Sequence, residues 1–344
     1  MRHGWLTKSI VLVFMLAISV GTAYAIEPIP EESGVSGFLN LGTVYIDAES
    51  NLIAGNDLGD IGKKEISSIF DSPDPESDIF PVINGELRYT FGKTRTQAYF
   101  GNLLEDYLRF DFSTLLGVRQ ELPDLSIAAV SFVFSGIPTE VWKDPYVENR
   151  NRDETDRTST GVRLTYDRIL GSRLQLQYTY RSIDIDDEES GRTYLALSNA
   201  EAKMLDREGD QHDAEMLYVF NIGEKHSLIP GFTYSRFDLD GDAMSRDRFL
   251  FQITHTYRGD QFTFITNAAY GLADYDDRNP IYNKKRDDDR YGGSFTTLYR
   301  LPFDLPLVKS SSIMGNVFGF KENSNIDFYD TQVIGASLSV LFRF

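Results

Sequence analysis

Apolar residues occupy every second position over residues 334–344, and this alternation constrains the fold more than any other feature of the chain. The apolar residues are Phe344, Phe342, Val340, Leu338, Ala336 and Ile334. The residues between them, such as Arg343, Ser339 and Gly335, are smaller or more polar. A period of two places alternate side chains on opposite faces of a β-strand. Residues 332–344 are therefore predicted to form a strand with one apolar face and one polar face.

The same alternation recurs along the chain. Between Arg173 and Arg181, four apolar residues alternate with polar ones, and similar patterns lie within 107–118, 162–167 and 249–257. Each segment is close to the ~10 residues that cross a bilayer as a tilted strand. Fourteen strands are predicted, near 36–46, 81–91, 95–102, 107–121, 125–135, 159–169, 173–184, 213–221, 227–237, 247–257, 261–273, 290–300, 308–320 and 332–344.

The connections between these strands alternate between short and long. Six are tight turns, such as Leu170-Gly171-Ser172, rich in residues that favour turns. Longer, charged loops lie near 47–80, 136–158, 185–212, 238–246, 274–289 and 321–331. Short turns at one end and long loops at the other are typical of outer-membrane barrels. The expected fold is all-β, a transmembrane antiparallel up-and-down β-barrel with 14 strands, or with 12 if 95–121 contains one hairpin fewer.

The amino-terminal segment has the features of a secretory signal peptide. Arg2 and Lys8 precede or flank an apolar run, and Ala23-Tyr24-Ala25 resembles a cleavage site. We expect residues 1–25 to be removed and 26–344 to form a single outer-membrane β-barrel domain. Export and membrane strands together predict the outer membrane of a Gram-negative bacterium. The expected partners are outer-membrane lipid, lipopolysaccharide and the barrel-insertion machinery, the last through a closing strand containing Leu338, Val340, Phe342 and Phe344.

Composition excludes some functions. The formal net charge is −18, which argues against nucleic acid as a partner because nucleic-acid binding requires basic patches. The chain contains no cysteine, so its stability must come from packing and hydrogen bonding without disulfides.

Several stretches of the chain resemble a family of uncharacterised proteobacterial outer-membrane β-barrel proteins, known as a domain of unknown function. The stretches that carry the resemblance are 54–60, 86–91, 117–124, 136–142 and 324–330. The resemblance extends over the whole chain after the signal segment. It implies the barrel architecture, and it brings no established activity and no catalytic residues.

Alternation also predicts which side chains point into the lumen of the barrel. The inward set comprises Glu86, Arg88, Arg109, Asp111, Arg119, Arg163, Asp167, Arg173 and Arg181. An excess of arginine would favour anionic solutes, because Arg binds carboxylate and phosphate and lines anion pores. In the alternative interpretation, these arginines pair with acids on neighbouring strands and fill the interior.

The long loops are strongly acidic, and Asp238, Asp240 and Asp242 are weak candidates for a cation site. Clustered carboxylates suit hard cations such as Ca²⁺. However, Gly241 comes too early for a calcium-binding loop, and no distal Glu follows in register. A solvated acidic rim is the simpler interpretation, so neither a metal nor a cofactor is expected. Short helical turns are expected near 62–70 and 199–206.

No motif indicates an enzyme. After residue 25 the chain contains only three histidines, His212, His226 and His255, and it has neither a Gly-x-Ser-x-Gly nor a His-Glu-x-x-His motif. The sequence favours a passive channel or porin-like pore for small solutes, with a preference for anions. The alternative is a closed structural or surface-interaction barrel whose acidic outer loops contact lipopolysaccharide, cations or a partner.

Overall fold

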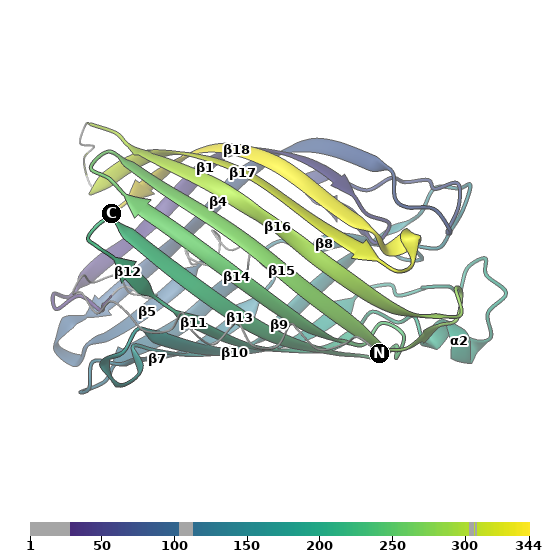
Figure 1. Ribbon diagram of the computed structural model, residues 1–344, viewed down its shortest axis with the longest axis horizontal. Coiled ribbons are helices and arrows are strands. Elements are labelled where there is room, and N and C mark those ends of the chain that lie inside the picture. Colours follow the sequence, from purple (N-terminus) through teal and green to yellow (C-terminus); the bar gives the residue numbers. More distant parts are fainter. Residues whose placement is uncertain (1–27, 103–112, 303–305, 307) are drawn as a thin grey trace, which may run out of the picture.

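The computed structural model describes residues 28–102, 113–302, 306 and 308–344. Fourteen antiparallel strands form a closed barrel (Figure 1). They are β1 (Gly34–Glu49), β4 (Pro75–Phe91), β5 (Thr96–Gly101), β6 (Thr114–Glu121), β7 (Ile127–Phe134), β9 (Glu154–Asp167), β10 (Leu174–Ile185), β11 (Gly209–Tyr218) with its continuation β12 (Phe220–Ile222), β13 (His226–Leu239), β14 (Arg246–Arg258), β15 (Phe262–Asn279), β16 (Lys284–Arg300), β17 (Ser310–Ser324) and β18 (Thr331–Arg343). The prediction of fourteen strands is confirmed, and the twelve-stranded alternative is wrong.

Two predicted segments fall outside these ranges. They are the signal peptide, 1–25, and the first part of the predicted strand 107–121, of which β6 is the described part. Within the described ranges, no helix is both long and apolar enough to cross a membrane.

The barrel closes where β1 pairs with β18. Their ladder runs from Phe38 opposite Arg343 to Glu49 opposite Gln332, so the terminal strand closes the barrel against β1. Beyond the ladder, the backbone N–H of Gly37 donates to the carbonyl of Phe344 at 3.0 Å, and the N–H of Phe344 donates back at 3.1 Å. The seam therefore leaves no open edge between these strands, as a structure in lipid requires.

Alternate side chains along each strand face opposite sides of the barrel wall. Outward residues are apolar and exposed, as at Ile83 (71 %) and Leu338 (62 %). Their inward neighbours Asn84 and Ser339 are polar and buried. An apolar exterior around a polar interior is the pattern of a barrel that stands in lipid.

At the end of the barrel with long loops, several strands continue further than predicted. β15 and β16 have 18 and 17 residues, whereas the sequence predicted 261–273 and 290–300. Beyond a bulge, Arg278 still pairs with Lys285 in the ladder, and Lys285 bonds the carboxylate of Asp274 at 3.1 Å. Cross-strand pairing thus extends the hairpin after the apolar alternation has ended, so the predicted loop 274–289 is mostly strand.

The remaining elements are short. They are β2 (Ile53–Asn56), β3 (Gly59–Asp60), β8 (Thr139–Trp142), α2 (Asn199–Lys203) and the 3₁₀ turns η1 (Gly92–Thr94), η2 (Ile169–Gly171) and η3 (Asp327–Tyr329). The helix expected near 199–206 is confirmed, and the side chains of Ser198 and Glu201 cap its first turn reciprocally. The helix expected near 62–70 is wrong, because Ile66 instead forms a bridge with Glu148.

All six long connections meet in one hydrophobic cluster, which we term the loop cap. Its buried residues are Ile66, Ile69, Tyr146, Leu205, Met244, Ile326, Phe328 and Tyr329, and Ile281 and Tyr282 pack against them. The loops and α2 gather at the right of Figure 1, opposite the end marked C. A solvated acidic rim does not account for these connections, because they bury a core of their own.

Aromatic hydroxyls tie the loop cap together. The hydroxyl groups of Tyr146 and Tyr329 lie 2.7 Å apart, and the side-chain amide of Asn279 donates to the Tyr329 oxygen at 2.6 Å. Burial raises the pKa of Tyr146 well above its ordinary value and also raises the pKa of Tyr329. Both side chains are therefore held neutral, with their polar atoms satisfied inside an apolar cluster.

Candidate functional site

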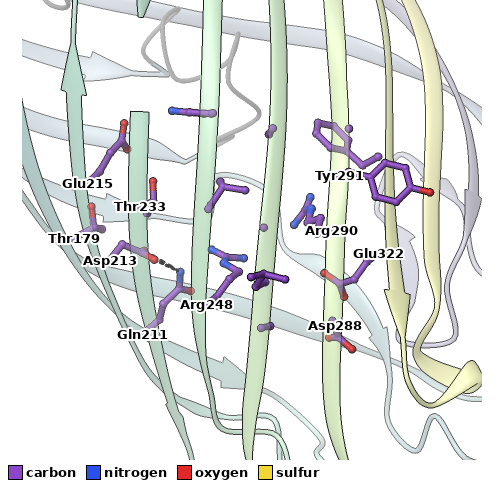
Figure 2. A pocket seen from close by; sticks show the side chains of 18 of the residues that line it. Thr179, Gln211, Asp213, Glu215, Thr233, Arg248, Asp288, Arg290, Tyr291 and Glu322 are labelled. Atoms are coloured by element: carbon purple, nitrogen blue, oxygen red, sulfur yellow. Dashed lines mark hydrogen bonds between the residues drawn. The ribbon is translucent and has the colours of Figure 1, made fainter. Parts of the chain in front are cut away.

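A polar cavity of about 280 Å³ lies inside the barrel wall in the half of the barrel next to the loop cap. Strands β9 to β11 and β13 to β17 supply its walls. Four arginines and four acids line it, namely Arg163, Arg181, Arg248, Arg290, Asp213, Glu215, Asp288 and Glu322. Figure 2 shows Asp213 and Glu215 on one side of the cavity and Asp288, Arg290 and Glu322 on the other. The lumen is thus lined by charges of both signs at this level of the barrel.

The acidic side chains of the cavity are engaged with partners. The amide nitrogen of Gln211 donates to Asp213 at 2.8 Å, and Arg181 lies 3.8 Å from the same carboxylate. Asp288 and Glu322 both bond the guanidinium of Arg286, at 2.7 and 3.3 Å. Much of the negative charge of the cavity wall is therefore neutralised by these contacts.

Arg286 also connects the cavity to the loop cap. Its guanidinium carbon lies 4.0 Å from the ring centre of Tyr329 and 4.5 Å from that of Tyr275. Cation–π contact of this kind stabilises a guanidinium that has lost water. The cap and the upper wall of the cavity therefore share one buried cation.

Arg248 and Arg290 differ from these paired groups. Within the part of the chain that the structure describes, neither forms an ion pair with a carboxylate. Arg248 donates to the hydroxyl of Ser235 at 3.1 Å, and its buried Nε has no hydrogen-bond partner. Arg290 lies over the ring of Phe320 at 5.3 Å, while the neighbouring Glu322 bonds Arg286. These two guanidinium groups therefore line the cavity without a close ion pair to a described carboxylate.

The structure places two of the residues predicted to be inward, Arg163 and Arg181, in the cavity wall. Arg163 donates to the hydroxyl of Thr179 at 3.1 Å, and Arg181 donates to that of Ser113 at 2.7 Å. Both occupy inward positions of their strands, in agreement with the alternation.

The other predicted residues lie elsewhere. Glu86 is buried in β4 and bonds Arg88 at 2.6 Å. Arg119 is buried in β6, where it donates to Gln97 at 2.8 Å, and Asp167 is buried at the end of β9. Arg173 is half-buried immediately before β10. Arg109 and Asp111 lie outside the described residues.

Sequence reasoning missed several residues of the cavity wall. Arg248 alternates with the outward Phe249 and Phe251, so the period of two contained the signal. Asp288 and Glu322 lie in predicted loops, because the sequence predicts that the strand of Asp288 begins at 290 and that the strand of Glu322 ends at 320. Contacts between neighbouring strands extend these strands, and the alternation of apolar and polar residues cannot predict such contacts.

The weak cation candidates do not form a compact site. Asp238 is exposed on β13 and bonds Arg236 at 3.4 Å, while Asp240 and Asp242 lie in the connection to β14. Among the residues that the structure describes, no group of three or more His, Cys, Asp or Glu side chains is arranged to hold a metal ion.

Residues 34–343 match the family described as "Protein of unknown function (DUF2860)". The chain belongs to this family. The resemblance derived from the sequence is thereby confirmed. No curated protein matches the chain.

Solved structures with a similar architecture include outer-membrane proteins from several bacteria. The outer membrane channel DcaP of Acinetobacter baumannii shares 10 % identity over 91 % of this chain and 97 % of its own, with a TM-score of 0.46. An anion-selective porin from Comamonas acidovorans shares 10 % identity over 91 % and 100 %, with a TM-score of 0.40. A Pseudomonas aeruginosa FadL homologue shares 12 % identity over 90 % and 89 %, with a TM-score of 0.42. These similarities are too distant to bear on the function of this DUF2860 protein.

Proposed function

We propose that this DUF2860 protein is a passive channel for small solutes that prefers anions. The observation that carries the proposal is the pair Arg248 and Arg290, which line the lumen cavity without an ion pair to any carboxylate among the described residues. An unpaired cation is costly in a low-dielectric interior unless water or an anion reaches it. A solvated lumen with a net positive patch would admit anions more readily than cations.

Reversal potentials across a planar lipid bilayer test this proposal. The wild-type protein should show anion preference at low salt, and the preference should weaken at high salt as the Debye length shrinks from ~30 Å at 0.01 M to ~3 Å at 1 M. The double variant Arg248→Gln/Arg290→Gln should move toward cation preference. The control is Arg236→Gln, because Arg236 bonds Asp276 on the outer face of the barrel. Wild-type protein that conducts with cation preference would overturn the assignment of anions.

A closed structural barrel is the second candidate, and the loop cap favours it. The cap buries Phe328, Tyr329 and Tyr146 almost completely, so the long loops form a packed layer at that end of the barrel. In this case the arginines stabilise a static interior, and the acidic loops contact lipopolysaccharide, cations or a partner. The absence of any conductance from folded, inserted protein would favour this candidate over the channel.

We also propose location in the outer membrane of a Gram-negative bacterium, after cleavage of the signal segment 1–25 and insertion by the barrel-insertion machinery. The apolar exterior of the barrel supports membrane insertion. Long loops then face the outside of the cell and short turns the periplasm. An epitope tag at Ser72 should be accessible on intact cells, whereas a tag at Ser172 should not. The reverse labelling pattern would invert the orientation.

A further inference from the structure

The wall between Arg248 and Arg290 is hollow because of three small residues on β15. Ala269, Gly271 and Ala273 occupy successive inward positions of this strand. In the ladders, Arg248 is opposite Ala273 and Arg290 is opposite Gly271. The two arginines therefore flank β15 diagonally, with Cα atoms roughly 12 Å apart for strand spacings of ~4.8 Å and rises of ~3.3 Å.

The small residues are confined to the inward face of β15. The outward residues on the same stretch, Tyr270 and Leu272, are large and exposed. A Cβ at Gly271 would lie 3.1 Å from the carbonyl oxygen of Phe249 and 3.2 Å from Leu250, so glycine is needed there for close packing against β14. At these three inward positions β15 carries no side chain larger than a methyl group. Arg248 and Arg290 lie on either side of this strand (Figure 2).

The chemistry around this hollow selects the kind of anion. A planar guanidinium presents a fork of donors that matches a carboxylate or phosphate. The cavity has as many acids as arginines in its lining, four of each, which disfavours multiply charged anions. A monoanion would meet less repulsion from these carboxylates, because Asp213 accepts from Gln211 and both Asp288 and Glu322 bond Arg286.

Neutral polar groups form another part of the lining. Gln211, Gln252 and Asn267 present amides, and Thr179 and Thr233 present hydroxyls. Such groups hydrogen-bond to hydroxyls of a ligand as donors or acceptors. The volume of about 280 Å³ lies below the ~300–1,000 Å³ of pockets that hold drug-sized molecules, so the cavity suits a molecule built on one ring.

We propose that Arg248 and Arg290 bind the carboxylate of a small hydroxylated acid of the sugar-acid type in this hollow. The amides and hydroxyls of the lining bind its hydroxyl groups. The proposal deepens the channel function and rests on it for the route by which the ligand arrives. Binding at this site would make passage of the acid through the lumen saturable.

Isothermal titration calorimetry on detergent-solubilised full-length protein tests the site without requiring conduction. The probes are D-glucuronate, D-glucose, which lacks the carboxylate, and inorganic phosphate, which lacks the ring. Glucuronate should bind saturably and more tightly than phosphate, and glucose should not bind. Tighter binding of phosphate, or no binding of glucuronate, would overturn the proposal.

Variants locate the binding site. Arg248→Gln and Arg290→Gln should each weaken glucuronate binding by about tenfold or more, as expected for loss of a hydrogen bond to a charged group. Ala273→Leu, which fills the hollow and keeps both arginines, should also abolish binding, whereas Arg236→Gln should leave it unchanged. Heat-modifiable gel migration confirms that each variant is folded. Unchanged affinity in the two arginine variants would overturn the site.

The outcomes separate this site from the channel itself. Protein that binds glucuronate but shows no conductance supports the site and contradicts the channel. Protein that conducts anions but neither binds glucuronate nor is blocked by it supports the channel and contradicts the site.

Discussion

Replacing Phe328 by alanine should loosen the loop cap selectively. Phe328 is completely buried, and its ring centre lies 5.1 Å from that of Tyr146, 5.2 Å from Tyr329 and 6.2 Å from Tyr282. Truncation of a buried Phe to Ala costs about 3–5 kcal/mol through lost transfer energy and the remaining cavity. Because the barrel wall does not depend on this side chain, the loss should appear in local opening of the cap.

Hydrogen exchange measures that opening. The backbone N–H of Tyr329 donates to the carbonyl of Ile326 at 2.9 Å, so its exchange requires the cap to open. Every ~1.4 kcal/mol corresponds to a factor of ten, and protection should fall between about one hundredfold and several thousandfold. Amides in the barrel ladder, such as that of Val340, should keep their protection.

Phe70→Ala is the matched control. Phe70 is 64 % exposed and touches the cap only at its edge, where its ring lies 5.9 Å from that of Tyr282. A surface change of this kind should alter stability within about 0.5 kcal/mol. If Phe328→Ala leaves cap exchange unchanged, or exposes barrel and cap amides equally, the cap is not a separately packed unit.

Three further predictions concern the seam and the cap. Deleting Phe344 should lower the yield of folded barrel because it removes two closing backbone bonds, and normal heat-modifiable migration would count against this. Tyr146 and Tyr329 should ionise at a higher pH than an exposed tyrosine, whose pKa is near 10, because burial raises the pKa of both side chains. Their contribution to cap stability is present below about pH 10 and is lost as the pH rises through their raised pKa values. Ultraviolet titration of tyrosinate checks this, and full ionisation with an intact cap would refute it. Arg286→Met should make the cap exchange faster, by about 3–5 kcal/mol of opening free energy, because it leaves the buried carboxylate of Asp288 without its cation. Unchanged exchange would show that the ion pairs are dispensable.

The sequence contained most of the barrel because each membrane strand obeys a local rule. Outward positions must be apolar, so Leu338 and Val340 specify both the strand and its orientation. The short turns followed from their turn residues in the same way. These signals need no knowledge of distant contacts.

The loop cap and the cavity could not be predicted in this way. Ile66 and Phe328 are far apart in the chain and lie in irregular connections, so no period marks them as one cluster. The two isoleucines of 62–70 gave a false helical spacing, since both pack into the cap. The sequence around Arg290 does not indicate whether it forms an ion pair. Its cross-strand neighbour Glu322 bonds Arg286 instead, and that contact depends on the folded structure.

The seam between β1 and β18 has a consequence for how the barrel assembles. Every other contact between neighbouring wall strands joins segments close in sequence, whereas this ladder joins Phe38 to Arg343. By the (3/2)RT ln n rule, a loop ten times longer costs only about 2 kcal/mol more to close, less than the many ladder bonds formed. Pairing of β1 with β18 is therefore slow, because the two strands are far apart in the sequence, but it is favourable once the ladder has formed. A curved, hairpin-built sheet with two exposed edges must persist until then, and those edges make the unclosed chain prone to aggregation.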